Sequence, residues 1–459
     1  MGDPTEPPGL LDLGGFALVI GLLLLVARRP ASRVEEYLVA NRSLGLFPLV
    51  ATLVMTEFNT STLVAFSAAG YRAGPMAVAL PMVFLIGLGF YTITVARAWK
   101  RFDRLSVAEL FATRYSIALG RFASVLLIVA MIGFSATYLT SLTLLARPWT
   151  GRLDPWSVSA GLAVVTLVVL LRGGLAAVVR TDVAGFVLTI GIVGALYVKS
   201  RTGVEIVPFP ELQRTVDPIA QWTHPALPFR FVATLIVLTC FTYIAAPWYG
   251  QKIFAARSER VAFLAVGIAT VLVFLLYGAV VLAAAAFRTR GGALADPQLV
   301  VPAMITAWLP DGLRGVGFGV LVIASLTTLS GVWSAMTAMV AADFGWTNAG
   351  SLPVQRFLTV AFALVCWLGA NLLGDDILDR LILANIPVAA LAFALLAGFH
   401  WKGATTAGAW ASVVVGVGWG VGCYLVVGEA GGYTWPWAIY GIPLIFATGI
   451  AGSLISARR

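Results

Sequence analysis

The chain alternates between long apolar stretches and short polar segments. A helix that crosses a lipid bilayer needs about 20 predominantly apolar residues. By this criterion the sequence predicts about thirteen membrane-spanning helices, at 10–28, 45–71, 76–98, 120–146, 156–172, 174–198, 228–250, 261–287, 313–343, 354–373, 378–399, 404–427 and 436–457. We therefore expect an all-α polytopic membrane protein.

Composition supports this class, because 60% of the 459 residues are hydrophobic and only 11% are charged. A soluble domain has about 25% charged residues, so little of the chain is expected outside the membrane. The net charge of +9 does not indicate a nucleic-acid partner, because the basic residues lie in short segments between the spans.

The distribution of basic residues predicts the orientation, because lysine and arginine concentrate in cytoplasmic loops. With the N-terminus outside, 19 of the 30 lysines and arginines lie in inside segments, three of them in 251–260. We therefore expect the N-terminus outside and the C-terminus inside. The densest basic segment, 97–122, would then face the cytoplasm. It is interpreted either as a signal for this orientation only or as a segment that also contacts anionic membrane lipid.

Residues that would mark an enzyme or an ATP-driven pump are not found in the sequence. Cys240, Cys366 and Cys423 lie far apart within predicted spans, and the chain has only two histidines. Neither a metal-binding spacing nor a phosphate-binding P-loop occurs. We expect no enzymatic activity.

Two carboxylates, Glu57 and Asp182, lie deep inside predicted spans whose other residues are neutral. A charge in hydrocarbon costs roughly 3 kcal/mol or more, so such residues usually mark a path for an ion or a substrate. For Asp182 two interpretations stand: a cation or proton site, or a structural ion pair with the nearby Arg180.

The second predicted span contains a polar run. Five of the six residues from Thr56 to Ser61 are polar. This favours a helix that breaks within the membrane, where freed carbonyls and hydroxyls can bind a cation. The alternative is an unbroken helix that uses threonine and serine for contacts between helices.

Oxygen ligands are also predicted on the span 313–343. Ala324, Thr327 and Thr328 have i, i+3, i+4 spacing, so they share one helix face. With carbonyls from a broken helix they would form a neutral oxygen shell, which suits a monovalent hard cation such as sodium. Such threonine pairs are also common in ordinary membrane helices. Trp248 and Tyr249 are interpreted as aromatic residues at the membrane interface.

Several motifs together resemble the sodium/solute symporter family, which includes sodium-coupled proline, sugar, sialic acid and vitamin carriers. They occur in family order over most of the chain. The motifs are EEYLVANRSLG at 35–45, GYRAG at 70–74, GGLAAVVRTD at 173–182, PWYGQKIFAARSERVA at 247–262 and ASLTTLS at 324–330.

The resemblance implies a transport core of five plus five inverted-repeat helices at 45–399. An N-terminal helix and linker at 1–44 would precede it, and two C-terminal helices at 400–459 would follow. It also implies one sodium site, whose ligands are the carbonyls of Met55, Phe58 and Ala324 and the hydroxyls of Thr327 and Thr328. Some members hold a second cation with an acid that matches Asp182 and with serines on the span 313–343. Ser330 matches one of these serines, but the next position is Gly331 in this chain.

Further site residues follow from the same resemblance. Glu57 matches an aspartate that is important for sodium in proline carriers. Sugar carriers have a glutamine that contacts the sugar at the position where this chain has Thr62. The solute is expected near the break, at Glu57, Asn59, Thr60, Ser61 and Thr62.

We therefore predict a bacterial inner-membrane secondary transporter that couples Na⁺ to uptake of a small polar organic solute by alternating access. An amino acid such as proline, or a small carboxylate, is the expected solute. Proton coupling through Glu57, with Asp182 as a relay, is one alternative. A membrane sensor that acts with a separate signalling protein is another. A monomer or loose oligomer is expected.

Overall fold

The computed structural model describes residues 8–151, 153–202, 227–344, 351–372, 377–429 and 432–458. Regular structure in these residues is helical, with one isolated β-bridge between Leu44 and Ala256. The principal helices are α1 (Leu10–Ala27), α2 (Val34–Val39), α3 (Leu46–Glu57), α4 (Thr60–Ala73), α5 (Ala79–Thr94), α6 (Ala96–Phe102), α7 (Glu109–Arg114), α8 (Ile117–Thr150), α9 (Pro155–Arg201), α11 (Phe229–Tyr243), α12 (Pro247–Phe254), α13 (Glu259–Thr289), α14 (Val300–Trp308), α15 (Leu313–Asp343), α16 (Leu352–Leu372), α17 (Ile377–Leu383), α18 (Ile386–Ala389), α19 (Ala392–His400), α20 (Thr406–Val427) and α21 (Thr434–Ala457). The prediction of an all-α polytopic membrane protein is confirmed.

The described residues contain ten helices that are long and apolar enough to cross a membrane, or eleven if the bent pair α11 and α12 forms one span. The prediction of thirteen is not confirmed, because neighbouring predicted spans run together in two places. The predicted spans 156–172 and 174–198 both lie in α9, which is interrupted at Gly174 with φ 53°. In the other place, α4 and α5 form one apolar segment, Thr60–Thr94, which contains Gly74 with φ 70°.

Two helices are interrupted within otherwise apolar segments. The segment predicted at 45–71 divides into α3 and α4, with Phe58 and Asn59 between them. The segment predicted at 228–250 divides into α11 and α12, whose axes differ by 46°. The prediction that the first of these helices breaks at its polar run is therefore confirmed by the backbone, while the second break was not predicted.

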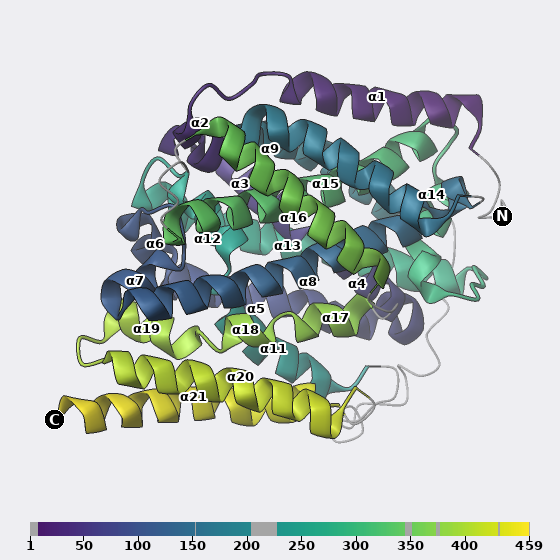
Figure 1. Cartoon of the computed structure of the whole chain (residues 1–459). Helices are drawn as coiled ribbons and strands as arrows, with labels where there is room; N and C mark the ends of the chain where they lie inside the picture. The colour runs from purple at the N-terminus through teal and green to yellow at the C-terminus, as the bar shows by residue number, and fades with distance from the viewer. Residues whose placement is uncertain are drawn as a thin grey trace.

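The long helix α15 lies at the centre of the bundle and is buried along nearly its whole length. It packs against α1, α8, α9 and α16. Figure 1 shows α1 along one edge of the bundle and the paired α20 and α21 along the opposite edge. The interior of the bundle therefore lies between α1 and the C-terminal pair.

Glycines let α1 approach α15 closely. A Cβ atom at Gly315 would lie 1.8 Å from the backbone oxygen of Asp12, and one at Gly15 would lie 2.1 Å from that of Gly312. The Asp12 carboxylate also accepts a hydrogen bond of 2.7 Å from the amide of Gly312. Small residues at helix contacts are the usual way for membrane helices to pack, because lipid offers no hydrophobic drive for association.

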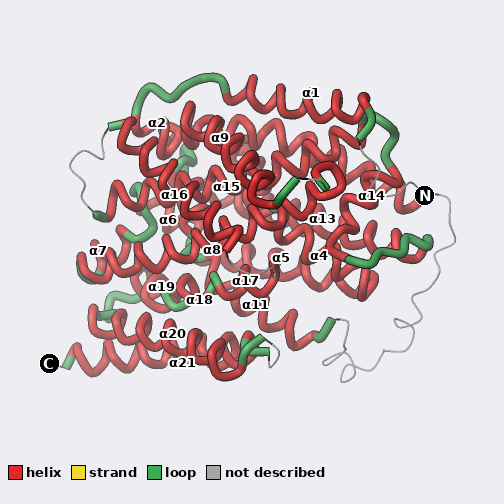
Figure 2. Tube along the Cα trace, turned by 45° about the vertical axis from the view of Figure 1, so that its right-hand side comes forward, coloured by secondary structure: helices red, strands yellow, loops and turns green. Residues whose placement is uncertain are grey.

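The described chain ends lie at opposite ends of the bundle (Figure 1). Figure 2 shows the same helices turned by 45°, with the C-terminus at the end where α7 and α19 lie. The basic segment that contains α6 and α7 is thus at the same end as the C-terminus. Residues 1–7, which belong to the predicted N-terminal region 1–44, lie outside the described residues.

Candidate ion and solute site

The break between α3 and α4 releases backbone groups inside the bundle. In a continuous helix the amide of Asn59 would donate to the carbonyl of Met55, four residues earlier. Here it donates instead to the Glu57 carbonyl, at 2.9 Å, and to the Tyr277 hydroxyl, at 3.0 Å. The Met55 carbonyl therefore lacks its usual helical partner. The side chain of Asn59 begins α4 by accepting a 2.9 Å hydrogen bond from the amide of Thr62. This is an ordinary N-cap.

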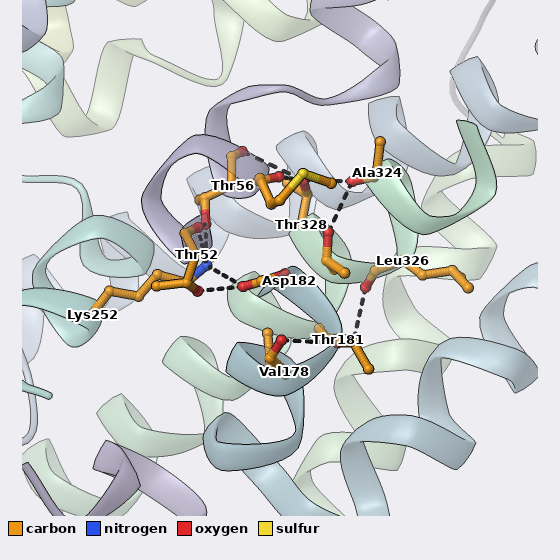
Figure 3. Close-up of polar contacts among 12 residues, drawn as sticks. Thr52, Thr56, Val178, Thr181, Asp182, Lys252, Ala324, Leu326 and Thr328 are labelled. Atoms are coloured by element: carbon orange, nitrogen blue, oxygen red, sulfur yellow. Dashed lines mark hydrogen bonds and ion pairs between the residues drawn. The ribbon is translucent and has the colours of Figure 1, made fainter. Parts of the chain in front are cut away.

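The freed carbonyl meets the predicted threonine face of α15. The Thr328 hydroxyl lies 3.1 Å from the Met55 carbonyl and 2.9 Å from the Ala324 carbonyl. The Thr327 hydroxyl lies 3.3 Å from the same Ala324 oxygen. Figure 3 shows Thr328 and Ala324 facing the α3 segment that contains Thr56. Four of the five predicted sodium ligands thus come together, and the fifth, Phe58, caps the end of α3.

The chemistry of this group suits sodium. All of its candidate ligand atoms are uncharged oxygens, from carbonyls of two helices and from threonine hydroxyls. A hydroxyl carries one proton and donates it to one carbonyl at a time, so oxygen lone pairs remain for a cation. Hard cations take such oxygen ligands.

Asp182 on α9 forms an ion pair that the sequence did not indicate. Its Oδ2 lies 3.2 Å from Nζ of Lys252, and both side chains are fully buried. The hydroxyl of Thr52 also donates to Oδ2 (Figure 3). The expectation that all other residues within the spans are neutral is wrong, because Lys252 belongs to α12 inside the bundle and not to an inside loop.

The alternative pairing of Asp182 is also wrong. Arg180 donates to the backbone oxygens of Val26, at 3.3 Å, and Arg29, at 3.0 Å. These carbonyls lie at the end of α1, so Arg180 fixes the N-terminal helix to α9. The partner of Asp182 comes instead from the interrupted helix α12.

Glu57, the last residue of α3, reaches the end of α11. Its Oε2 accepts a hydrogen bond from the hydroxyl of Tyr243, while Oε1 is buried without a hydrogen-bond partner among the described residues. The Glu57 carbonyl accepts a second hydrogen bond, of 2.6 Å, from Tyr277. The carboxylate thus connects the two helix breaks.

A cavity of ≈ 90 Å³ lies beside this contact, lined by Asn59, Thr62, Phe66, Val83, Phe84, Phe134, Tyr138, Leu235, Leu238, Thr239, Thr242, Tyr243, Trp248, Leu381, Ile382 and Asn385. Two predicted solute-binding residues, Asn59 and Thr62, are in this wall. Thr60 and Ser61 are not, because their hydroxyls bond to Ser141, and that of Thr60 also to Ser325. They join α4 to its neighbours α8 and α15.

Two aromatic residues at the start of α12, of which Trp248 lines the cavity, were not predicted as residues of the site. Trp248 and Tyr249 are 5% and 0% exposed, so the prediction that they lie at the membrane interface is wrong. The ring of Trp248 packs edge-on against Phe134, with centroids 5.0 Å apart. Their position directly after the break at the start of α12 was the available signal, but the break itself was not predicted.

Comparison with known proteins decides the family. A model of the sodium:solute symporter family matches residues 37–416. The chain belongs to the sodium:solute symporter family. This symporter is therefore a membrane transporter and not an enzyme, and sodium is its coupling ion. The resemblance inferred from the sequence motifs is confirmed.

Relatives of this symporter are known from bacteria. It is 24% identical to the sodium/pantothenate symporter of Escherichia coli (strain K12), over 89% of this chain and 88% of that protein. It is 23% identical to the sodium/pantothenate symporter of Haemophilus influenzae, over 88% of this chain and 87% of that protein. Such relatives indicate a multi-pass protein of the bacterial inner membrane.

Solved structures share the fold. A Na⁺-coupled sialic acid symporter in a substrate-bound, outward-open state is similar with a TM-score of 0.79 and 16% identity, covering 97% of this chain and 98% of that chain. A manganese transporter of Eremococcus coleocola gives a TM-score of 0.55 and 12% identity, covering 94% and 98%. At these identities the likeness concerns the fold alone.

Proposed function

We propose that this symporter couples sodium to the uptake of an amino acid, a solute that carries an ammonium group beside a carboxylate. The observation that carries the proposal is the Glu57–Tyr243 hydrogen bond. It brings the two interrupted helices together beside a small aromatic cavity. Interrupted helices in membrane transporters are typical sites of substrate and ion binding.

Sodium is proposed to bind between α3 and α15. The ligands would be the carbonyls of Met55, Phe58 and Ala324 and the hydroxyls of Thr327 and Thr328. The short distances from Thr328 to the Met55 and Ala324 carbonyls support this assignment. Because these ligands come from separate helices, bound sodium would hold α3 against α15 and so stabilise one state of the transport cycle.

The charge around the cavity favours an ammonium group. None of the described residues that line the wall is a lysine or an arginine. The buried Glu57 carboxylate lies behind Tyr243, and one of its oxygens has no hydrogen-bond partner among the described residues. An ammonium group would supply that partner. Aromatic faces such as those of Tyr138 and Trp248 also attract cations. A solute with only a negative charge would find no compensating side chain among the described residues of this wall.

The solute's carboxylate is proposed to face the beginning of α4. Asn59 and Thr62 line the cavity there, and a helix N-terminus carries partial positive charge. A cavity of ≈ 90 Å³ is well above the minimum of about 10–15 Å³ that one water needs. We propose that it admits a small solute such as proline.

The positions of the two breaks support a core of five plus five inverted repeats at 45–399. The broken helix α3–α4 begins the first predicted group of five spans. The broken helix α11–α12 begins the second, at 228–250. Interruptions at corresponding positions of two halves are typical of inverted-repeat transporters. The helix before this core and the two after it would be additions at its edges.

We also propose that the C-terminus faces the cytoplasm and the N-terminus the outside. The chain ends lie at opposite ends of the bundle, and the basic segment of α6 and α7 lies at the end of the C-terminus (Figure 1). Basic segments favour the cytoplasmic side.

The sodium gradient supplies the energy for uptake. Inward movement of one sodium ion across about 100 mV yields roughly 2.3 kcal/mol, enough for tens-fold accumulation of solute.

Ligand-dependent stability of the purified protein tests the proposal. Thermal unfolding would be measured in sodium chloride and in choline chloride, with amino acids, small carboxylates, sugars and pantothenate. Pantothenate is included because the two bacterial relatives are named for it. We expect stabilisation by an amino acid that is larger in sodium. Stabilisation by pantothenate or another pure carboxylate instead would overturn the amino-acid assignment, and equal responses in both salts would overturn the sodium site.

A further inference from the structure

Lys252 carries a buried positive charge that the proposed sodium and solute sites do not use. It lies on α12, and its side chain is fully buried. Its ammonium has three donors and three oxygen partners. These are Oδ2 of Asp182 at 3.2 Å, the backbone oxygen of Thr52 at 2.9 Å and the hydroxyl of Thr56. Figure 3 shows this ammonium between α3 and Asp182.

The partners of Lys252 form the kind of shell that binds a monovalent cation. One carboxylate, one carbonyl and one hydroxyl are hard oxygen ligands of the type sodium takes. The carboxylate is held in position by the hydroxyl of Thr52. An ammonium group and a sodium ion carry the same charge, so either one would neutralise Asp182.

This shell adjoins the proposed sodium site. The Thr328 hydroxyl, a proposed sodium ligand, lies 3.4 Å from the backbone oxygen of Thr56, whose side chain binds Lys252. On the next turn of α15, a Cβ atom at Gly331 would lie 3.7 Å from Nζ of Lys252. The ammonium of Lys252 therefore lies next to position 331 of α15, where glycine has no side-chain oxygen that could bind a cation.

The remaining candidate ligand for a second ion faces elsewhere. The Ser330 hydroxyl donates to the Leu326 carbonyl of its own helix at 2.7 Å. Asp182 is bound to Lys252, and Gly331 has no hydroxyl. Of Asp182 and Ser330, the charged residue is thus already neutralised by the chain itself.

We propose that Lys252 is a tethered cation that takes the place of a second sodium ion and fixes the coupling at one sodium per solute. The inference rests on the proposed sodium site, because it concerns how many ions bind beside Asp182. Lys252 is then a residue that determines ion stoichiometry. Replacing Lys252 by a neutral side chain should open a sodium site at Asp182.

Binding of radiolabelled sodium to the purified protein, measured without solute, tests this directly. We expect one sodium ion per chain for the natural protein and two for Lys252→Met. The double variant Lys252→Met, Asp182→Asn should bind one, because the carboxylate is gone. Lys100→Met is the matched control and should also leave one ion. Lys100 is a buried lysine that pairs with Asp103 at 2.8 Å and donates to the backbone oxygen of Phe254 at 2.9 Å, and it does not pair with Asp182.

The outcomes separate this inference from the proposed function. No sodium bound to the natural protein would overturn the proposed sodium site itself. Two ions bound to the natural protein, or one bound to Lys252→Met, would overturn the tethered cation while leaving the first site in place.

Thermal stability gives a second readout if Lys252→Met folds poorly. A tethered cation predicts that Lys252→Met loses stability in choline chloride and regains it with increasing sodium chloride. Adding Gly331→Ser should lower the sodium concentration needed, because a hydroxyl joins the shell. Equal loss in both salts would show a purely structural ion pair and would overturn the proposal.

Discussion

Glu57 accepts a hydrogen bond from Tyr243, and this contact joins the ends of two interrupted helices. Aromatic rings surround it: Phe84 stacks on Tyr277 with centroids 5.7 Å apart and meets Tyr243 edge-on at 5.9 Å. The Tyr277 hydroxyl in turn bonds to the carbonyl of Glu57. A movement of α11 that breaks the Glu57–Tyr243 contact would therefore expose a buried carboxylate oxygen to the cavity.

Removing the Tyr243 hydroxyl should destabilise the protein. Tyr243→Phe leaves a buried oxygen of Glu57 without its donor, which is expected to lower the free energy of unfolding by about 1–3 kcal/mol. The double variant Tyr243→Phe, Glu57→Met should recover most of the loss, because both polar partners are gone. Unfolding in detergent without solute measures both. Purely additive losses of stability in the double variant would contradict an interaction between Tyr243 and Glu57. Tyr440→Phe is the control, because that side chain is 58% exposed.

Thr328→Ala should weaken sodium binding. The variant removes a hydroxyl that lies between the Met55 and Ala324 carbonyls. We expect the sodium concentration for half-maximal stabilisation to rise about tenfold, which corresponds to about 1.4 kcal/mol. Thr166→Ala is the matched control, because that buried hydroxyl bonds to a carbonyl of its own helix. The site assignment fails if both variants keep the natural sodium dependence.

Much of the fold follows from hydrophobic length alone, and the first helix break follows from its polar run. Five of the six residues from Thr56 to Ser61 are polar and would find too few hydrogen-bond partners in lipid, so they indicated an interruption correctly. The helix count of thirteen is not confirmed, because the spans predicted on either side of Gly74 lie in one apolar segment, and those on either side of Gly174 lie in one helix. Hydropathy places a boundary near each glycine but does not show whether the helix ends there or only changes direction.

Lys252 shows why part of the site was not predicted. It precedes Arg257 and Arg260, so it was counted with a basic inside segment. The residues directly after it, Ile253 to Ala256, are apolar and fully buried. This apolar continuation was a usable signal that Lys252 lies inside the bundle. Its partner Asp182 is 70 residues away in the chain, and pairing over such a distance depends on the fold.

Glu109, on the short helix α7 outside the membrane spans, should make stability depend on pH. Burial raises the pKa of its carboxyl, although the backbone amide of Leu105 donates to it at 3.4 Å. A raised pKa means that the folded state favours the protonated form. Its contribution to stability is therefore full below the usual value of 4.5 and is lost as pH rises through the raised pKa.

Glu109→Gln removes this titration. The variant should be more stable than the natural protein at pH 7, and the difference should shrink as pH falls toward about 4.5, near the ordinary glutamate pKa. Thermal unfolding across this range measures the effect. Parallel pH profiles of the two proteins would show that Glu109 does not contribute.

Gly174 should be among the least replaceable positions of α9. Its φ of 53° is unfavourable for any residue with a Cβ atom, and that atom would lie 2.3 Å from the backbone oxygen of Tyr37. Tyr37 is fully buried on α2, so it has no free space into which to move. Gly174→Ala should therefore lower the free energy of unfolding by more than about 1–3 kcal/mol, the cost of such a sparsely populated backbone conformation alone.

Gly191, on the same helix, supplies the matched control. A Cβ atom there meets nothing within 4 Å, and its backbone is in the ordinary helical region. Gly191→Ala is expected to leave stability unchanged or to raise it by about 0.5–1 kcal/mol, because alanine restricts the unfolded chain. Unfolding of both variants in the same detergent gives the comparison. Equal shifts for the two would mean that the break at Gly174 does not require glycine, and that the two halves of α9 are joined by an ordinary helical turn.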